Sequence, residues 1–160
     1  MERSEKILQG LREFKGAGRR FEYRGTYKGA KIYNDYGHHP EEVAATIQAT
    51  APIQKNRLWL IYQPALFSRT KAQFERLVDC FCGADKTVII DVYGDREPFD
   101  PTINSKMIVD KIKEKHGSDC LYIPGMEECG AYLKKQLQPG DLVLIMGSGT
   151  VDILDKFILT

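Results

Sequence analysis

The 160-residue chain lacks the short motifs that mark many self-sufficient catalytic sites. It contains no Gly-x-x-x-x-Gly-Lys-Ser/Thr phosphate loop, no Gly-x-Ser-x-Gly nucleophile elbow and no His-Glu-x-x-His zinc motif. Each of these motifs supplies a part that a common class of enzyme needs, namely a phosphate cradle, a nucleophile or a metal. We therefore predict that the chain carries no complete catalytic apparatus of its own.

The chain also lacks an excess of charge and any long apolar run. Its 23 Lys and Arg residues balance 22 Asp and Glu residues, so no overall field favours nucleic acid or an anionic membrane. No stretch approaches the roughly twenty apolar residues of a membrane span, and the charges within residues 1–14 are unlike a secretory signal. We expect a cytoplasmic protein that binds neither nucleic acid nor membrane.

The four cysteines lack the spacing of a metal site or a disulfide framework. Cys80 and Cys82 lie two residues apart in a predicted helix, so their side chains point to nearly opposite sides. The adjacent His38 and His39 are poorly placed to converge on one ion. We predict free thiols in a reducing compartment and no metal site.

Apolar patterning predicts a single domain in which strands and helices alternate. A short amphipathic helix over residues 4–14 precedes two strands, 20–24 and 30–34, that form a hairpin. Helices are then expected from Pro40, from a cap at Ser68, and over 105–115, 126–137 and 151–158, with strands at 58–62, 87–92, 120–123 and 142–146. Strands that are apolar on both faces belong to a covered parallel sheet. The predicted fold is α/β, a Rossmann-like doubly wound, mostly parallel sheet with an N-terminal hairpin.

The densest group of reactive side chains is the segment Asn34-Asp35-Tyr36-Gly37-His38-His39-Pro40. It follows a predicted strand, and ligands of doubly wound sheets bind at the carboxyl ends of strands. Asp35 could accept hydrogen bonds from ribose hydroxyls, and His38 could donate or accept one near pH 7. In the alternative interpretation, Asp35 caps the next helix and the histidines are solvated turn residues.

Three other segments offer positive or donor groups. Arg69 is predicted in the first turn of a helix, where it binds a ligand carboxylate or phosphate or is simply solvated. The loop Gly147-Ser148-Gly149-Thr150 presents backbone N–H groups that suit an anion, or forms only a tight turn. Arg19-Arg20 could meet a phosphate, although paired arginines are also common on protein surfaces.

At these same segments the sequence resembles the C-terminal domain of the Mur ligases, from about residue 10 onward, and within that family the branch that joins L-alanine to UDP-N-acetylmuramate. Five groups of residues occur in the family's order. They are Phe14-Lys15-Gly16 with Arg19-Arg20-Phe21-Glu22, then Asn34 to Glu42, then Gln63-Pro64 with Ser68-Arg69-Thr70-Lys71, then Ala84-Asp85 with Asp91-Val92-Tyr93, and finally Pro139-Gly140-Asp141-Leu142-Val143 with Met146-Gly147.

The resemblance implies a three-domain ligase of peptidoglycan precursor synthesis, with an N-terminal UDP-binding domain and a central ATPase domain. Residues 1–18 would be a linker or the end of the central domain, and residues 19–160 the C-terminal domain, inactive alone. ATP and Mg²⁺ would be bound mainly by the central domain. ATP would phosphorylate the muramoyl carboxylate, and L-alanine would attack the acyl phosphate.

The resemblance also implies a role for each of five residues. Arg20 and Asp35 would contact the nucleotide. Tyr36, His38 and Arg69 would line the site for L-alanine and the muramoyl group of UDP-N-acetylmuramate. No catalytic residue is implied within this domain.

Two segments depart from the family's pattern. Ala65-Leu66-Phe67 stands where the alanine-adding members usually have His-Arg-Tyr, and Gly147-Ser148-Gly149-Thr150 stands where they usually have Gly-Ala-Gly-Asp. These differences leave two alternatives open: a related ligase that recycles murein peptides, and a stand-alone module that binds a nucleotide or a partner and catalyses nothing.

Overall fold

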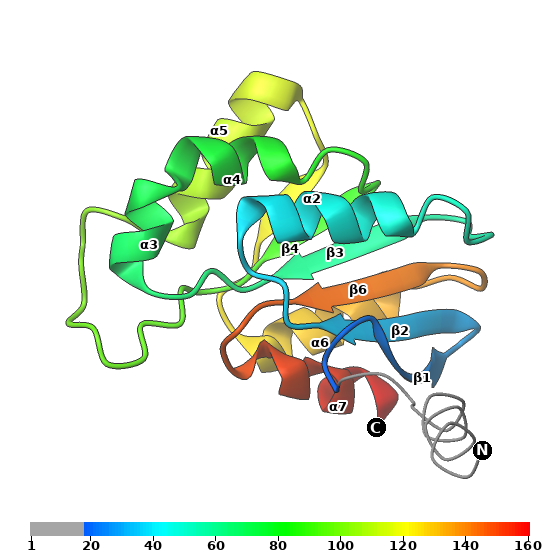
Figure 1. The fold of residues 1–160 in the computed structure, drawn as a ribbon. Coiled ribbons are helices and arrows are strands. Elements are labelled where there is room, and N and C mark those ends of the chain that lie inside the picture. The colour runs from blue at the N-terminus through cyan, green and yellow to red at the C-terminus, as the bar shows by residue number, and fades with distance from the viewer. Residues whose placement is uncertain (1–17) are drawn as a thin grey trace, which may run out of the picture.

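The computed structural model of the protein describes residues 18–160 (Figure 1). The predicted helix over residues 4–14 lies outside the described residues, as does all but the last residue of the predicted 1–18 linker.

A six-stranded sheet forms the centre of the domain, with its strands in the order β1-β2-β6-β3-β4-β5. Only β1 runs antiparallel to its neighbour, and every other adjacent pair is parallel. The strands are β1 (Glu22–Tyr27), β2 (Ala30–Asp35), β3 (Leu58–Tyr62), β4 (Lys86–Ile89), β5 (Cys120–Tyr122) and β6 (Leu142–Met146). The predicted mostly parallel sheet with an N-terminal hairpin is confirmed.

Helices cover both faces of this sheet (Figure 1). The first face packs against α2 (Pro40–Ala49), α4 (Phe74–Cys80) and α5 (Ser105–His116), and the second against α6 (Met126–Gln136) and α7 (Leu154–Leu159). The chain steps through β2, β3, β4 and β5 in one direction, then returns by way of α6 to insert β6 between β2 and β3. The strand order therefore reverses at β6, where doubly wound sheets bind their ligands.

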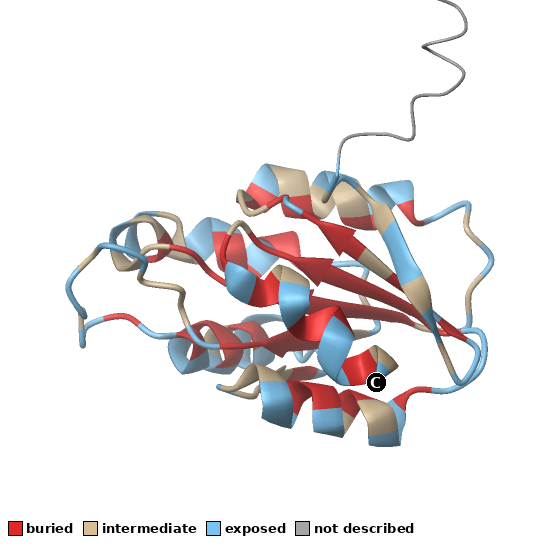
Figure 2. Cartoon of the chain, turned by 90° about the horizontal axis from the view of Figure 1, so that it is seen from below, coloured by how far each residue is buried: buried red, intermediate tan, exposed pale blue. Residues whose placement is uncertain are grey.

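The two central strands, β3 and β6, are buried along their whole length (Figure 2). Because successive side chains of a strand point to opposite faces, Leu60 and Tyr62 join the core under α2, α4 and α5, whereas Trp59 and Ile61 join the core over α6 and α7. This double burial explains why the β3 sequence is continuously apolar rather than alternating. Because β3 and β6 are buried to their last residues, the loops that follow them begin from well-packed positions.

The hairpin begins two residues later than predicted. Arg19 and Phe21 have positive φ angles of 57° and 46°, a conformation that interrupts an extended strand. β1 consequently starts at Glu22 rather than at residue 20, and a bulge between Tyr23 and Gly25 shifts its register against β2.

The helix predicted from a cap at Ser68 is two helices. α3 (Phe67–Ala72) and α4 meet at Gln73, whose φ and ψ of −107° and 12° are not helical. Leu66 occupies the N-cap position of α3, and the Ser68 hydroxyl donates instead to the carboxylate of Glu97. The capping prediction for Ser68 is therefore wrong, because the helix begins one residue before it.

Two other boundaries also differ from the predictions. The last predicted helix is a 3-10 turn, η1 (Thr150–Ile153), followed by α7, and the strand predicted over 87–92 ends at Ile89. Among the helices of the described residues, none combines the length and apolar character needed to cross a bilayer.

Candidate functional site

A cavity of about 220 Å³ opens at the carboxyl ends of four neighbouring strands. The loops after β2, β3, β4 and β6 each contribute to its lining, which consists of Tyr36, His38, Ala65, Leu66, Arg69, Tyr93, Asp95 and Ser148. The fold thus brings together all three predicted substrate-binding residues, and with them one residue of the predicted anion loop. Arg20 lies beside the cavity, exposed, with its guanidinium carbon 5.5 Å from the centroid of the Tyr36 ring.

Asp35 immediately precedes Tyr36 of the lining and holds the loop after β2 in place. It is 5% exposed, and its two carboxylate oxygens accept the backbone N–H groups of Gly37 at 2.7 Å and Phe21 at 2.9 Å. Residue 37 has no room for a side chain, because a Cβ there would stand 2.8 Å from the Asp35 Oδ1. His39, not Asp35, holds the N-cap position of α2, so the capping alternative is wrong. Each oxygen keeps a second lone pair, and a ribose contact stays a prediction.

His38 lines the cavity, and its Nε2 forms no hydrogen bond with the described residues. Its Nδ1 lies 3.1 Å from the carbonyl oxygen of Tyr36, which can only accept, so Nδ1 carries the proton and Nε2 the lone pair. The buried Tyr62 hydroxyl donates to the His38 carbonyl at 2.7 Å. Burial lowers the pKa of His38, aided by the nearby Arg69 charge and opposed by the Tyr36 carbonyl and Glu42. A neutral imidazole with an available acceptor is therefore expected at pH 7.

Arg69 brings a positive charge to the opposite wall. It is the third residue of α3, half-buried, and its guanidinium forms no hydrogen bond or ion pair with the described residues. Lys71, two residues on, is turned away and engaged by Thr102 at 2.8 Å and Asp100 at 3.7 Å. Of the two cations that the sequence places here, Arg69 is thus the one available to a ligand carboxylate or phosphate, which a guanidinium can bind through two hydrogen bonds.

The Gly147–Gly149 loop closes the site between β6 and η1. The Gly147 N–H donates to the Asp35 carbonyl at 3.2 Å, and the carbonyls of Gly147 and Gly149 accept from Arg19 Nη2 at 2.8 and 3.2 Å. Ser148 is the member of the loop that lines the cavity. The loop therefore presents two carbonyl oxygens to a cation of the protein itself, and anion binding by Gly147 and Ser148 stays a prediction.

Comparison with known families identifies this arrangement. Residues 19–149, which include every loop of the site, match the family described as Mur ligase, glutamate ligase domain. The chain belongs to the Mur ligase family. Its resemblance to the C-terminal domain of these ligases is thereby confirmed.

Individual relatives agree with this assignment of the Mur ligase domain. The chain is 41% identical over 147 residues to the UDP-N-acetylmuramate–L-alanine ligase of Lachnospira eligens, covering 92% of the chain and 32% of that protein. It is 42% identical over 157 residues to the ligase of the same name from Agathobacter rectalis, covering 95% and 34%. The chain spans about a third of the length of these curated relatives.

Solved structures show the same fold at lower identity. A murein peptide ligase from Psychrobacter arcticus superposes with a TM-score of 0.76 at 19% identity, over 94% of this chain and 31% of that one. A UDP-N-acetylmuramate-alanine ligase from Thermotoga maritima superposes with a TM-score of 0.75 at 21% identity, over 96% and 32%. At these identities the structures support the fold alone.

The sequence prediction missed part of the lining of the Mur ligase domain's cavity. Tyr93 and Asp95 follow β4, and the Tyr93 hydroxyl donates to Asp95 at 3.3 Å. Tyr93 also packs against Gly149, where a Cβ would stand 2.8 Å from its ring and would displace it. Position after a parallel strand was the signal that could have identified both residues, because the ends of parallel strands share one edge of a sheet.

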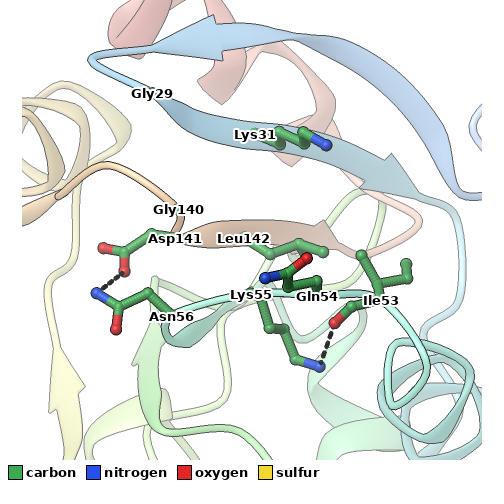
Figure 3. A pocket seen from close by; sticks show the side chains of 9 residues that line it. All are labelled: Gly29, Lys31, Ile53, Gln54, Lys55, Asn56, Gly140, Asp141 and Leu142. Atoms are coloured by element: carbon green, nitrogen blue, oxygen red, sulfur yellow. Dashed lines mark hydrogen bonds between the residues drawn. The ribbon is translucent and has the colours of Figure 1, made fainter.

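A larger cavity, of about 540 Å³, lies at the amino ends of the strands (Figure 3). Its buried Asp141 accepts from Arg57 Nη2 at 2.6 Å and from Trp59 Nε1 at 3.1 Å, and Lys55 donates to the carbonyls of Thr50 and Ile53. Asp141 and Lys55 thus have partners within the fold, and of the charged residues of this lining only the exposed Lys31 has none among residues 18–160. In the smaller cavity, neither Arg69 nor the His38 Nε2 has a partner among those residues. We therefore assign the ligand chemistry to the smaller cavity.

Neither end of the sheet forms a metal centre from its own side chains. Within residues 18–160, no three His, Cys, Asp or Glu side chains gather closely enough to hold an ion. All four cysteines are free thiols, as predicted, and burial raises the pKa of Cys80, Cys120 and Cys129 to about 12 in each case. Unreactive thiols of this kind serve the core rather than the site.

Proposed function

We propose that the chain acts as the C-terminal domain of an ATP-dependent ligase that joins L-alanine to UDP-N-acetylmuramate in the cytoplasm. The observation that carries the proposal is the convergence of Tyr36, His38 and Arg69 on one cavity at the strand-order reversal. A guanidinium without a partner among the described residues and a neutral imidazole in the same cavity suit a small zwitterion, because one group attracts its carboxylate and the other accepts from its amine.

In this proposal Arg69 binds the carboxylate of L-alanine, and the His38 Nε2 accepts a hydrogen bond from its amino group. The lowered pKa of His38 keeps that nitrogen free of a proton at neutral pH. Together the two contacts hold the amine in position for attack on an activated carboxyl group, which is an orientation effect rather than a chemical step. Tyr36, 37% exposed, lines the same cavity.

The activated carboxyl would belong to the muramoyl group of UDP-N-acetylmuramate. ATP supplies a phosphoryl group for that activation, and both ATP and Mg²⁺ would be held mainly by a central domain. On this chain Arg20 would face the nucleotide, since it is exposed and its guanidinium lies over the Tyr36 ring beside the cavity. A UDP-binding N-terminal domain would complete the enzyme.

The test is Arg69→Ala in the native polypeptide that carries this sequence, with Arg76→Ala as the matched control. Arg76 is an exposed arginine of α4 whose partner is the exposed Glu41. Loss of a two-bond contact to a charged group should lower kcat/KM for L-alanine about 100-fold. Amino-acid-dependent ADP release in the presence of UDP-N-acetylmuramate measures it, and Arg76→Ala should match the wild type.

The same assay separates the proposed reaction from its alternatives. Ligation of a murein peptide in preference to L-alanine would indicate a recycling ligase. A wild-type polypeptide that consumes no ATP with either substrate would contradict the proposal and leave a binding module. An unaltered kcat/KM in Arg69→Ala would remove the role assigned to that residue.

A further inference from the structure

Arg19 combines a strained backbone conformation with a buried side-chain donor that has no hydrogen-bond partner among the described residues. Its φ of 57° is uncommon for a residue other than glycine. Its Nε atom is buried without a hydrogen-bond partner among the described residues, and the nearest carboxylate oxygen, of Asp152, is 3.9 Å away. Strained backbone and unsatisfied buried donors persist where the surrounding structure imposes them, and they cluster at functional sites.

The Arg19 side chain joins two walls of the candidate site. Its Nη2 donates to the carbonyls of Gly147 and Gly149, at 2.8 and 3.2 Å, and so holds the loop that carries Ser148. Its guanidinium carbon also lies 4.9 Å from the centroid of the Tyr36 ring, within the range of a cation–π contact. One planar group therefore touches both the loop after β6 and the loop after β2.

The Arg19 backbone reinforces this link. Its carbonyl accepts the Tyr36 N–H at 2.6 Å, and its own N–H donates to the Glu22 carboxylate at 2.8 Å. Asp35 fixes the next turn of the chain by accepting the Phe21 N–H. The left-handed conformation at residue 19 is thus stabilised by hydrogen bonds on both sides, and Tyr36 is bound to Arg19 through main chain and side chain alike.

We propose that Arg19 is a positioning residue of the amino-acid site, an inference that rests on the proposed function of the cavity. By holding the Gly147–Gly149 loop and Tyr36 on one guanidinium, Arg19 sets the separation of the loops after β6 and β2, which line the same cavity as Arg69. Lysine cannot replace it, because a single ammonium lacks the planar fork that donates to carbonyls while lying flat on a ring.

The first arm of the test uses the 160-residue chain itself. Arg19→Asn removes the guanidinium while keeping a residue that tolerates positive φ. We expect the amide NMR resonances of Ser148 and Gly149 to move in Arg19→Asn. In Arg20→Asn they should keep their wild-type positions, because the Arg20 guanidinium forms no hydrogen bond with this loop in the described structure. Wild-type loop resonances in Arg19→Asn would overturn the proposal.

The second arm measures the site in the native polypeptide that carries this sequence. Arg19→Asn should raise KM for the amino acid about tenfold, the loss expected for a hydrogen bond from a charged group, with a smaller change in kcat. Guanidinium added to Arg19→Asn at a non-denaturing concentration should lower KM part of the way back to the wild-type value. Arg19→Lys should keep a raised KM, and Arg76→Asn should match the wild type. An unchanged KM, or lost activity that follows the unfolded fraction without rescue, would overturn the proposal.

The two arms separate this proposal from the function beneath it. An active wild type with unmoved loop resonances or unchanged KM in Arg19→Asn contradicts the role of Arg19 alone. A wild-type polypeptide that ligates no amino acid contradicts the proposed function, and the positioning role falls with it even if the resonances move.

Discussion

The polar side chains at the two ends of the sheet differ in whether they have partners within the fold. At the amino end, in a cavity of about 540 Å³, the buried charge is paired within the fold, because Asp141 is 1% exposed and bound by Arg57, and of the charged lining residues only the exposed Lys31 has no partner among the described residues. At the carboxyl end a cavity of about 220 Å³ keeps Arg69 without an ionic partner among the described residues and His38 with a free nitrogen. Cavity size therefore indicates function less well than whether the polar lining is already satisfied.

The sharpest test of this division is Asp141→Ala at the amino end. Burial would raise the pKa of Asp141, but hydrogen bonds from Arg57, the Gln138 N–H and Trp59 outweigh it and hold the pKa below its usual value. Removing the carboxylate leaves Arg57 without its partner, so the free energy of unfolding in urea should fall by about 3 kcal/mol. KM for the amino acid should not change.

Asp119→Ala is the matched control for that change, because Asp119 pairs with Lys86 in solvent and should contribute under about 1 kcal/mol. If Asp141→Ala raised KM while leaving unfolding unaffected, the amino end would be a ligand site and the comparison would fail.

Gly149→Ala probes the packing of the carboxyl end. A Cβ at residue 149 would stand 2.6 Å from Gln63 Oε1 and 2.8 Å from the Tyr93 ring, so both side chains must move. Overpacking of this kind costs about 1–3 kcal/mol, and urea unfolding should detect that loss of stability. The affinity for the amino acid should also fall. Gly125→Ala, where the nearest atom is 3.7 Å away, should leave both quantities close to wild type.

Tyr62→Phe tests how the core supports His38. The Tyr62 hydroxyl is buried and donates to the His38 carbonyl at 2.7 Å, so its removal should lower the free energy of unfolding by about 1 kcal/mol. Tyr122→Phe, whose hydroxyl bonds to the exposed Asp91, is the control and should cost less. An equal loss of unfolding free energy in the two variants would show that the buried hydrogen bond to His38 stabilises the fold no more than the exposed one to Asp91.

The smallest expected effect is a pH dependence from His38. Because the folded pKa lies below the unfolded value of about 6.5, the unfolded state binds the proton first. The His38 contribution to stability should be constant above that pH and decline as pH falls through the folded pKa. Urea titrations of wild type and His38→Gln at several pH values measure it, and identical pH profiles would contradict the lowered pKa.

Much of this organisation could be predicted because it depends on local patterns. Continuously apolar strands predicted the parallel sheet, and the rule that ligands meet strand ends drew attention to the segment that holds Asp35 and His38. The grouping of Tyr36, His38 and Arg69 in one site was implied by the family resemblance, and all three line one cavity. Tyr93 follows a predicted strand and belongs to the groups of residues that carry the resemblance, yet neither observation gave it a role in the site.

The wrong predictions concern choices that neighbouring segments decide. Ser68 is of a residue type that often caps helices, but its hydroxyl donates a hydrogen bond to Glu97, 29 residues away. Asp35 precedes a helix, yet Phe21 and Gly37 supply the N–H groups that its carboxylate accepts. A short polar side chain near a helix start has several available partners, and only the packed chain selects one.

The sequence by itself determined the alternation of strands and helices, the family, and the set of side chains available at the strand ends. Hydrophobic periodicity and local motifs suffice for these, because they act over a few residues. Only the tertiary structure decided which charges remain free. Arg57 meets Asp141 84 residues away, and Arg19 meets Gly147 128 residues away. Such pairings depend on strand order, which the return of β6 between β2 and β3 establishes.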